Sequence, residues 1–346
     1  MRAFILAAGY STRLWPLTVD RAKPAMPFLG RPLVGYVAEY LARYGYQDVL
    51  VNLHHQGDTV RRALGDGSTY GVHLHYVEEP EILGTSGAWD NARSLLADEP
   101  FLAINGKIVT DIDLDAALRT HSEQGALATL VLRANINREH FSVVNTCDGF
   151  VTGFGGMPSS QASDNDGAAP LMFTGIQILD PRIFDYIPRA CFSQSTTDVY
   201  PQAIARGERI AAHLAEGEWH ELSTIPRYRD VSLRFLHQAG QDLIMGRSTV
   251  IAPGATVRDS ILWDDVRISE EALVRGAVIG DNVVIESGAR LESAAVVRAE
   301  LVRGQEPPAK ALKGYFQEKT LLCRFRNDTM RRDRGRVVTI VEDHGR

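Results

Sequence analysis

The residues best suited to chemistry lie near the amino terminus, where a turn of small residues precedes two basic side chains. Ala7, Ala8 and Gly9 follow a short apolar run, and their small size lets a flat ring or a phosphate approach the main chain. The backbone N–H groups of such a turn can bind an anion. Arg13 can form a bidentate contact with phosphate oxygens, and Lys23 adds a point charge. Together these residues predict a site for a nucleoside triphosphate.

A tight strand-to-helix turn with basic residues on the surface is the structural alternative, because glycine-containing turns are common. The longer sequence favours the functional interpretation. Residues 6–18 and 23–27 closely resemble the signature of the sugar-nucleotide pyrophosphorylases, nucleotidyltransferases that join a sugar 1-phosphate to a nucleoside triphosphate and release pyrophosphate. The resemblance continues in the same order through residues 79–87, 105–114, 173–176 and 219–224.

The resemblance implies a role for individual residues. Arg13 would hold the leaving pyrophosphate, and Lys23 would neutralise charge near the α-phosphate. The main chain of residues 7–9 would read the base, and residues 84–87 would close over the base and ribose. The implied nucleotide-binding residues are Ala7, Ala8, Gly9, Tyr10, Ser11, Thr12, Arg13, Gly84, Thr85, Ser86, Gly87 and Asn105. The implied sugar-binding residues are Thr174 and Gly175.

The chain departs from the family pattern at three places. Ser11 stands where the family usually has glycine, so the backbone there must accept a side chain. Two aspartates usually hold Mg²⁺, but Lys107 and Glu221 occupy those positions. A Glu-Lys-Pro string usually meets the sugar phosphate, and the matching stretch here is Gly156-Met157-Pro158.

The changed metal positions lead to a specific hypothesis. A lysine ammonium cannot bind Mg²⁺, which requires oxygen ligands. We expect Lys107 to take the place of the metal and to pair with Glu221, so that nucleotide binding persists while Mg²⁺ binding is weak. Asp111 and Asp113 are alternative ligands, although their position between a strand and a helix favours helix capping.

The string Leu83-Gly84-Thr85-Ser86-Gly87 resembles the guanylyl-transferring branch of the family, which implies GTP and mannose 1-phosphate as substrates. Two functions follow from these observations. The first is nucleotidyl transfer to a sugar 1-phosphate. The second is a catalytically weakened protein that binds a nucleotide sugar and regulates or scaffolds a partner, which the exchange at Lys107 and Glu221 favours.

Strand-like and helix-like segments alternate over the first 240 residues, so these elements are expected to position the site. Alternation of this kind predicts an α/β domain with a Rossmann-like mixed, mainly parallel sheet, which binds ligands at the carboxyl ends of its strands. The predicted helices are 33–44 and 88–96. The predicted strands are Ala3–Leu6, Asp48–Leu53, 73–77, Phe101–Asn105, 127–132 and Leu171–Leu179.

Aliphatic residues recur every six positions after residue 246, with one-residue slips before Leu262 and Ile279. This spacing predicts a short left-handed parallel β-helix over residues 249–304. Residues 305–346 would form a basic tail. The predicted inward-facing residues are Ile251, Val257, Leu262, Ile268, Val274, Ile279, Ile285, Leu291 and Val297, with Ala255, Val266, Ala272, Val283, Ala289 and Ala295 between them. The basic residues of the tail are Arg324, Arg326, Arg331, Arg332, Arg334 and Arg336.

Composition indicates which partners and which cellular compartment to expect. The net charge of −6 argues against nucleic acid as a partner. We find no apolar run near the ~20 residues that span a bilayer. Three scattered cysteines fit reduced thiols in the cytoplasm. We also expect a homo-oligomer, with the sides of the β-helix and the basic tail as contact surfaces.

Overall fold

The computed structural model describes residues 1–156 and 169–325, and the chain divides into two compact units. The first unit comprises Met1–Gly9 and Val34–His220, and the second comprises Tyr10–Leu33 and Glu221–Arg346. Each unit contains its own hydrophobic core. The small, polar, glycine-rich stretch 156–170 is expected to form a surface loop, and its residues 157–168 lie outside the described residues, as do five of the six tail arginines.

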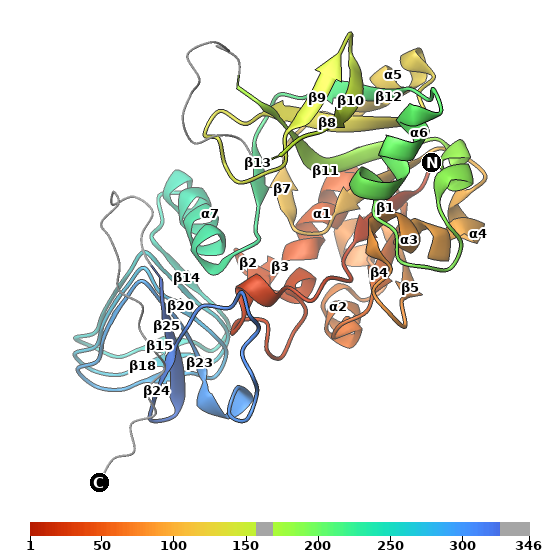
Figure 1. Cartoon of the computed structure of the whole chain (residues 1–346). Coiled ribbons are helices and arrows are strands. Elements are labelled where there is room, and N and C mark those ends of the chain that lie inside the picture. Colours follow the sequence, from red (N-terminus) through yellow and green to blue (C-terminus); the bar gives the residue numbers. More distant parts are fainter. Residues whose placement is uncertain (157–168, 326–346) are drawn as a thin grey trace. The chain divides into compact units, whose positions relative to one another are not determined.

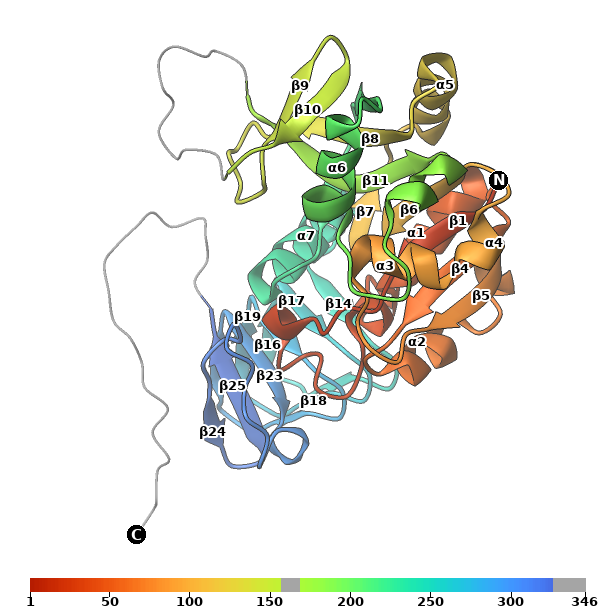
Figure 2. The same cartoon turned by 45° about the vertical axis from the view of Figure 1, so that its right-hand side comes forward.

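The described part of the first unit contains a nine-stranded sheet in the order β5-β4-β1-β6-β11-β8-β12-β10-β9 (Figure 2). Parallel pairs join β5 to β4, β4 to β1, β1 to β6 and β8 to β12, whereas β11, β10 and β9 run antiparallel to their neighbours. The mixed Rossmann-like sheet is therefore confirmed. Its strands are β1 (Ala3–Leu6), β4 (Asp48–Leu53), β5 (His73–Glu78), β6 (Phe101–Asn105), β8 (Ala128–Ala134), β9 (Val144–Cys147), β10 (Phe150–Phe154), β11 (Leu171–Leu179) and β12 (Ile210–Leu214).

Short helices connect these strands. The α-helices of this part are α1 (Leu33–Arg43), α2 (Gly57–Leu64), α3 (Gly84–Asn91), α4 (Arg93–Leu96), α5 (Leu114–Gln124) and α6 (Tyr200–Ala205). The remaining short helices are η3 (Ser68–Tyr70), η4 (Pro181–Tyr186) and η5 (Ser195–Val199). The helix predicted over 88–96 is wrong in its bounds, because α3 begins at Gly84 and ends before Ala92, where α4 follows. Two short strands, β7 (Ile108–Thr110) and β13 (Trp219–Glu221), form a separate ribbon.

The order of strands places β1 at a switch point of the sheet. After β1 the chain passes through α1 to β4 on one side, and after β5 it returns to β6 on the other side of β1. The loops after β1 and β6 therefore diverge at the carboxyl ends of adjacent parallel strands. Crevices of this kind are where open α/β sheets bind their ligands.

The second unit contains stacked parallel coils, with the helix α7 (Ile225–Gln238) before them (Figure 1). Three stacks of strands build the coils. These are β14 (Leu243–Met245), β17 (Ser260–Leu262), β20 (Val278–Ile279) and β23 (Ala294–Arg298); β15 (Val250–Ile251), β18 (Arg267–Ile268) and β21 (Val284–Ile285); and β16 (Thr256–Arg258), β19 (Leu273–Arg275) and β22 (Arg290–Glu292). The parallel β-helix is therefore confirmed.

Each coil contains 17 residues, so one of its three sides is a residue shorter than the other two. This explains both slips of the six-residue spacing. Ile268 faces the core, as predicted, and it pairs with Ile251 on one side and with Ile285 on the other. The prediction of Val297 is wrong, because Val296 pairs with Ile279 and enters the core of the coils. The shorter side of the coil occurs again between Leu291 and Val296. For the same reason Ala294, and not the predicted Ala295, lies in the core of the coils.

A hairpin closes the side of the coils. Strands β24 (Tyr315–Gln317) and β25 (Thr320–Arg324) follow the turn η6 (Ala299–Leu301), and β25 pairs antiparallel with β23. Cys323 is buried by this pairing, whereas Arg324 is exposed. The first part of the expected tail thus packs on the β-helix. Among the described residues, no helix has the length and apolar character needed to cross a membrane.

Replacing Ile268 with alanine should lower the free energy of unfolding by about 2–5 kcal/mol, since Ile268 is 2% exposed and deletion leaves a cavity between two coils. Replacing its exposed neighbour Arg267 with alanine should change it by less than about 0.5 kcal/mol. Urea denaturation followed by circular dichroism measures both. Equal effects of the two substitutions would contradict the inward direction of Ile268.

Candidate functional site

The small residues after β1 border open space in the first unit. Ala7 and Ala8 are buried, at 6% and 7% exposure, while Gly9 is exposed. A Cβ atom added to Gly9 would meet no atom within 4 Å, and its φ angle is not positive. The fold therefore does not require glycine at this position. A ligand lying against the main chain would require it.

A buried hydrogen-bond chain holds this turn. The Ala7 N–H donates to Asn52 Oδ1 at 2.6 Å, and Asn52 Nδ2 donates to Glu79 Oε1 at 2.6 Å. The Leu83 N–H donates to Glu79 Oε2 at 3.1 Å. Asn52 and Glu79 are each 3% exposed. The chain thus links the turn after β1 to the residue before Gly84, which are the two segments expected on either side of the base.

Sequence reasoning missed this role of Asn52 and Glu79. The available signal was a polar residue inside the apolar strand β4, because a buried amide must find hydrogen-bond partners. Burial raises the pKa of Glu79 and outweighs the hydrogen bonds from Asn52 and Leu83, which favour the carboxylate. Glu79 therefore holds its proton more tightly in the folded protein than in the unfolded chain.

Residues 84–87 form the first turn of α3 and pack closely on another loop. A Cβ atom on Gly84, whose φ is +76°, would lie 2.4 Å from the Ser193 carbonyl oxygen, and one on Gly87 would lie 2.6 Å from the Cys191 oxygen. The N–H groups of Ser86 and Gly87 donate to the same Ser193 oxygen at 3.1 and 3.2 Å. These two donors are therefore used inside the protein.

Side chains tie the same turn to residues 193–195. Thr85 Oγ1 accepts from the Ser195 N–H at 2.8 Å and donates to Gln194 Oε1 at 3.1 Å, while Ser86 Oγ donates to Ser193 Oγ at 2.8 Å. No sequence pattern indicated this support. The turn is thereby fixed on one side, and its closure over the base and ribose stays a prediction.

Of the two expected sugar residues, Gly175 lies against Asn105. Gly175 has a φ of +83°, and a Cβ atom there would lie 2.1 Å from Asn105 Nδ2, so only glycine fits opposite Asn105. Thr174 is 1% exposed, and its hydroxyl donates to the Val131 carbonyl at 2.7 Å. Trp219 Nε1 donates to the Thr174 oxygen at 2.9 Å. The Thr174 side chain therefore supports the sheet.

The continuation of the turn, from Tyr10 onward, belongs to the second unit. Tyr10 is 54% exposed, and Arg13 is exposed on the short helix η1 (Thr12–Leu14). Ser11 has φ 56° and ψ 29°, a left-handed conformation that favours glycine, which accounts for the family's usual residue. Lys23 is only 8% exposed and begins the short helix η2 (Lys23–Ala25).

Comparison with known proteins gives the family. A model of the nucleotidyl transferase family matches residues 2–238, and a GlmU-like C-terminal hexapeptide model matches residues 237–305. The chain belongs to the nucleotidyl transferase family. The resemblance stated from the sequence is thereby confirmed for both parts of the chain.

The relatives of this chain are named for different nucleotides and sugars. It is 34% identical to an N-acetylmuramate alpha-1-phosphate uridylyltransferase of Neisseria meningitidis serogroup B, over 66% of this chain and 96% of that one. It is 26% identical to a UTP–glucose-1-phosphate uridylyltransferase of Synechocystis sp. (82% and 76% covered) and also 26% identical to a mannose-1-phosphate guanylyltransferase of Mycobacterium tuberculosis (85% and 79%).

A solved structure supports the fold. It belongs to a Bacillus anthracis protein assigned as a glucose-1-phosphate thymidylyltransferase, in complex with a sucrose. It matches with a TM-score of 0.58 at 21% identity and covers 71% of this chain and 98% of that chain.

The positions expected for the metal do not hold two aspartates. Lys107 lies in the first unit and is partly exposed, whereas Glu221 lies in the second and is 7% exposed, so their pairing stays a prediction. Within residues 1–156 and 169–325, no group of three or more His, Cys, Asp or Glu side chains is arranged to hold a metal ion. A lysine ammonium only donates hydrogen bonds, so these residues do not fit the family's usual Mg²⁺ site.

The two alternative aspartates have structural partners. Asp113 caps α5, since its carboxylate accepts the N–H groups of Asp115 and Ala116 at 2.9 and 3.1 Å, which confirms its prediction. Asp111 instead accepts the Glu218 N–H at 2.6 Å, so capping is wrong for this residue. The Asp111 carboxylate is thus used by the backbone of Glu218 and not by the first turn of α5. Of the expected sugar-phosphate stretch, Met157 and Pro158 lie outside the described residues.

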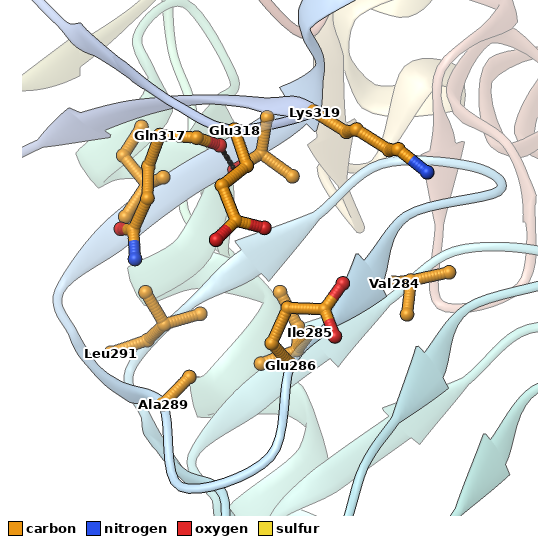
Figure 3. Close-up of a pocket in the computed structure, with 10 residues that line it drawn as sticks. Val284, Ile285, Glu286, Ala289, Leu291, Gln317, Glu318 and Lys319 are labelled. Carbon is orange, nitrogen blue, oxygen red and sulfur yellow. Dashed lines mark hydrogen bonds between the residues drawn. The ribbon is translucent and has the colours of Figure 1, made fainter. Parts of the chain in front are cut away.

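A separate pocket lies in the β-helix, between the coil of β21 and the turn of β24 and β25 (Figure 3). Glu286 and Glu318 approach it from different segments, and Thr320 Oγ1 donates to the Gln317 carbonyl at 2.9 Å. Its volume of about 40 Å³ is far below the ~300–1,000 Å³ of ligand sites. It has room for water, not for a nucleotide.

Replacing Glu79 with glutamine should alter how stability depends on pH. The folded state raises the pKa of Glu79 from its ordinary value of 4.5. The free energy of unfolding of the wild type therefore falls as pH rises from about 4.5 to the higher pKa of the folded state, and Glu79→Gln lacks this decrease. Urea denaturation from about pH 4 to about pH 8 measures the difference between the two proteins. The exposed Glu81→Gln is the control. A wild-type-minus-variant difference that does not change with pH would contradict the assignment.

Proposed function

We propose that this protein transfers a nucleotidyl group from a nucleoside triphosphate to a sugar 1-phosphate and releases pyrophosphate. The observation that carries the proposal is the turn at residues 7–9. It lies at the carboxyl end of β1, at the switch point of the sheet, and open space borders Gly9. Membership of the nucleotidyl transferase family supports the same reaction class.

The reaction needs positioning and charge stabilisation more than covalent help from the protein. A sugar phosphate oxygen attacks the α-phosphorus in line, and the bond to the pyrophosphate oxygen breaks as the new P–O bond forms. In this proposal Arg13 holds the leaving pyrophosphate, and Lys23 offsets the charge that develops near the α-phosphate. The buried environment of Lys23 strengthens that interaction relative to water.

GTP and mannose 1-phosphate are the proposed substrates, on the strength of the Leu83-to-Gly87 string. The relatives from Neisseria and Synechocystis are named for uridylyl transfer, so UTP is the comparison that matters most. An assay of pyrophosphate release, run over five nucleoside triphosphates and a panel of sugar 1-phosphates, separates these choices. Release with UTP but not GTP would replace the guanylyl assignment.

The second candidate function is a nucleotide-sugar-binding regulator. Lys107 favours it, since a cation stands where the family usually places a metal ligand. The two candidates differ in turnover and agree in binding. If this protein binds a nucleotide sugar but releases no pyrophosphate in the assay, the regulator is supported.

Replacing Gly9 with valine should weaken triphosphate binding by about 10- to 100-fold, because the new side chain fills the space beside the main chain. The unfolding midpoint should stay unchanged, since a Cβ atom at residue 9 would meet no protein atom within 4 Å. Gly153→Val is the matched control, because a Cβ at Gly153 also meets nothing within 4 Å. Isothermal titration with GTP and UTP measures binding. Unchanged affinity in Gly9→Val would refute the cradle.

Replacing Lys107 with aspartate should strengthen Mg²⁺ binding in the presence of nucleotide, since a carboxylate replaces a cation near the phosphates. Calorimetric titration of Mg²⁺ into the nucleotide-loaded protein measures the change. Increased pyrophosphate release by Lys107→Asp would indicate an enzyme that has lost its metal ligand. Tight, site-specific Mg²⁺ binding by the parent protein would show the hypothesis about Lys107 to be wrong.

A further inference from the structure

The segment that carries both proposed phosphate-binding side chains belongs to the β-helix unit. Tyr10–Leu33 contains Arg13 and Lys23 and groups with Glu221–Arg346. The short strands β2 (Pro27–Phe28) and β3 (Arg31–Pro32) of this segment are labelled beside the coils in Figure 1, and the red segment that contains them also lies next to the coils in Figure 2. Its regular structure consists of three-residue helices and two-residue strands, so its shape depends on what it packs against.

Arg21 joins this segment to the coils. Its guanidinium forms an ion pair with Asp281, which lies in the turn between β20 and β21, and stacks over the Trp263 ring with 4.8 Å to the centroid. Arg21 Nε also donates to Asp20 Oδ1 at 2.9 Å. The Arg21 and Asp281 side chains are 20% and 21% exposed. A cation shielded from water between an aromatic face and two carboxylates is held far more firmly than an exposed one.

Asp281 is itself fixed by the coils, because its Oδ1 accepts the Asp264 N–H at 3.0 Å. A second attachment lies at Pro27, further along the segment. The Tyr228 hydroxyl of α7 donates to the Pro27 carbonyl and accepts from Trp263 Nε1 at 3.2 Å. Trp263 therefore takes part in both attachments.

Aromatic packing completes the second attachment. Phe28 and Phe235 of α7 meet edge to face, with 5.8 Å between ring centroids. Lys23 lies between the two attachments in sequence, two residues after Arg21 and four before Pro27. The coils thereby hold the chain on both sides of this lysine.

We propose that the β-helix is part of the triphosphate-binding machinery, in which Asp281 and Trp263 hold Arg21 and so position Lys23. This inference rests on the proposed function of Lys23. Arg21, Asp281 and Trp263 are positioning residues in it, and they do not touch the substrate. The β-helix then has a role in the chemistry through the segment it holds, with no ligand site of its own.

The experiment compares the full-length wild type with Arg21→Met, Asp281→Asn and the double variant. The expected result is a tenfold or larger rise in the Kd for GTP or UTP in each single variant and no further rise in the double variant. A purely structural role would lower the unfolding midpoint and leave the Kd of the folded fraction unchanged.

Arg247→Met is the matched control, because Arg247 forms an ion pair with Asp264 in the same coils but is 90% exposed. Amide hydrogen exchange gives a readout independent of nucleotide. Residues 10–33 should exchange faster in Asp281→Asn and not in Arg247→Met.

Unchanged exchange in Asp281→Asn, or faster exchange with unchanged affinity, would overturn the inference. So would an equal loss of affinity in Arg247→Met. If the wild type binds no triphosphate, the proposed function fails together with this inference, whereas binding by the wild type and equal binding by the Arg21 variants defeats the inference alone.

Discussion

The hydrogen-bond chain from Ala7 through Asn52 and Glu79 to Leu83 is the interaction on which the candidate site depends. Both side chains are almost fully buried, so each polar atom that lost its partner would carry the cost of desolvation. This series of hydrogen bonds fixes both the backbone after β1 and the start of α3. Small side chains restrict the backbone of a turn only weakly. In this turn the hydrogen bonds therefore fix the backbone conformation that larger side chains would otherwise fix by packing.

A second constraint acts on α3 from the opposite side. Gly84 and Gly87 approach the carbonyl groups of Ser193 and Cys191 so closely that no side chain fits. The glycines of this motif therefore have a structural cause in this protein, independent of any ligand. Gly9 differs, because nothing in the fold occupies the space beside it. This contrast separates glycines that the packing requires from the glycine that a ligand would require.

In the inference proposed above, the coils of the second unit support a binding site that lies outside the repeat. A stack of 17-residue coils is rigid, since each strand pairs with the next and one aliphatic side chain from each enters a continuous core. A segment with little regular structure of its own gains a fixed shape by attaching to such a body. Arg21, held by Asp281 and Trp263, is one polar attachment of that segment to the coils. Lys107 belongs to the other unit, and in the proposed function it affects Mg²⁺ binding and not this attachment.

The sequence by itself determined the elements and the family. Strands such as Ala3–Leu6 and Phe101–Asn105 could be read directly, because apolar runs bounded by glycine are local patterns. The six-residue spacing likewise predicted the β-helix, but it misplaced Val296 by one residue, since the position of a short side is set by stacking on the coil below. Only the tertiary structure decided the supports of the site. Asn52 and Glu79 lie 27 residues apart, Thr85 and Ser195 lie 110 apart, and Arg21 and Asp281 lie 260 apart. No local pattern encodes such pairs, because a buried hydrogen bond or ion pair is chosen by which strands and coils become neighbours when the chain folds.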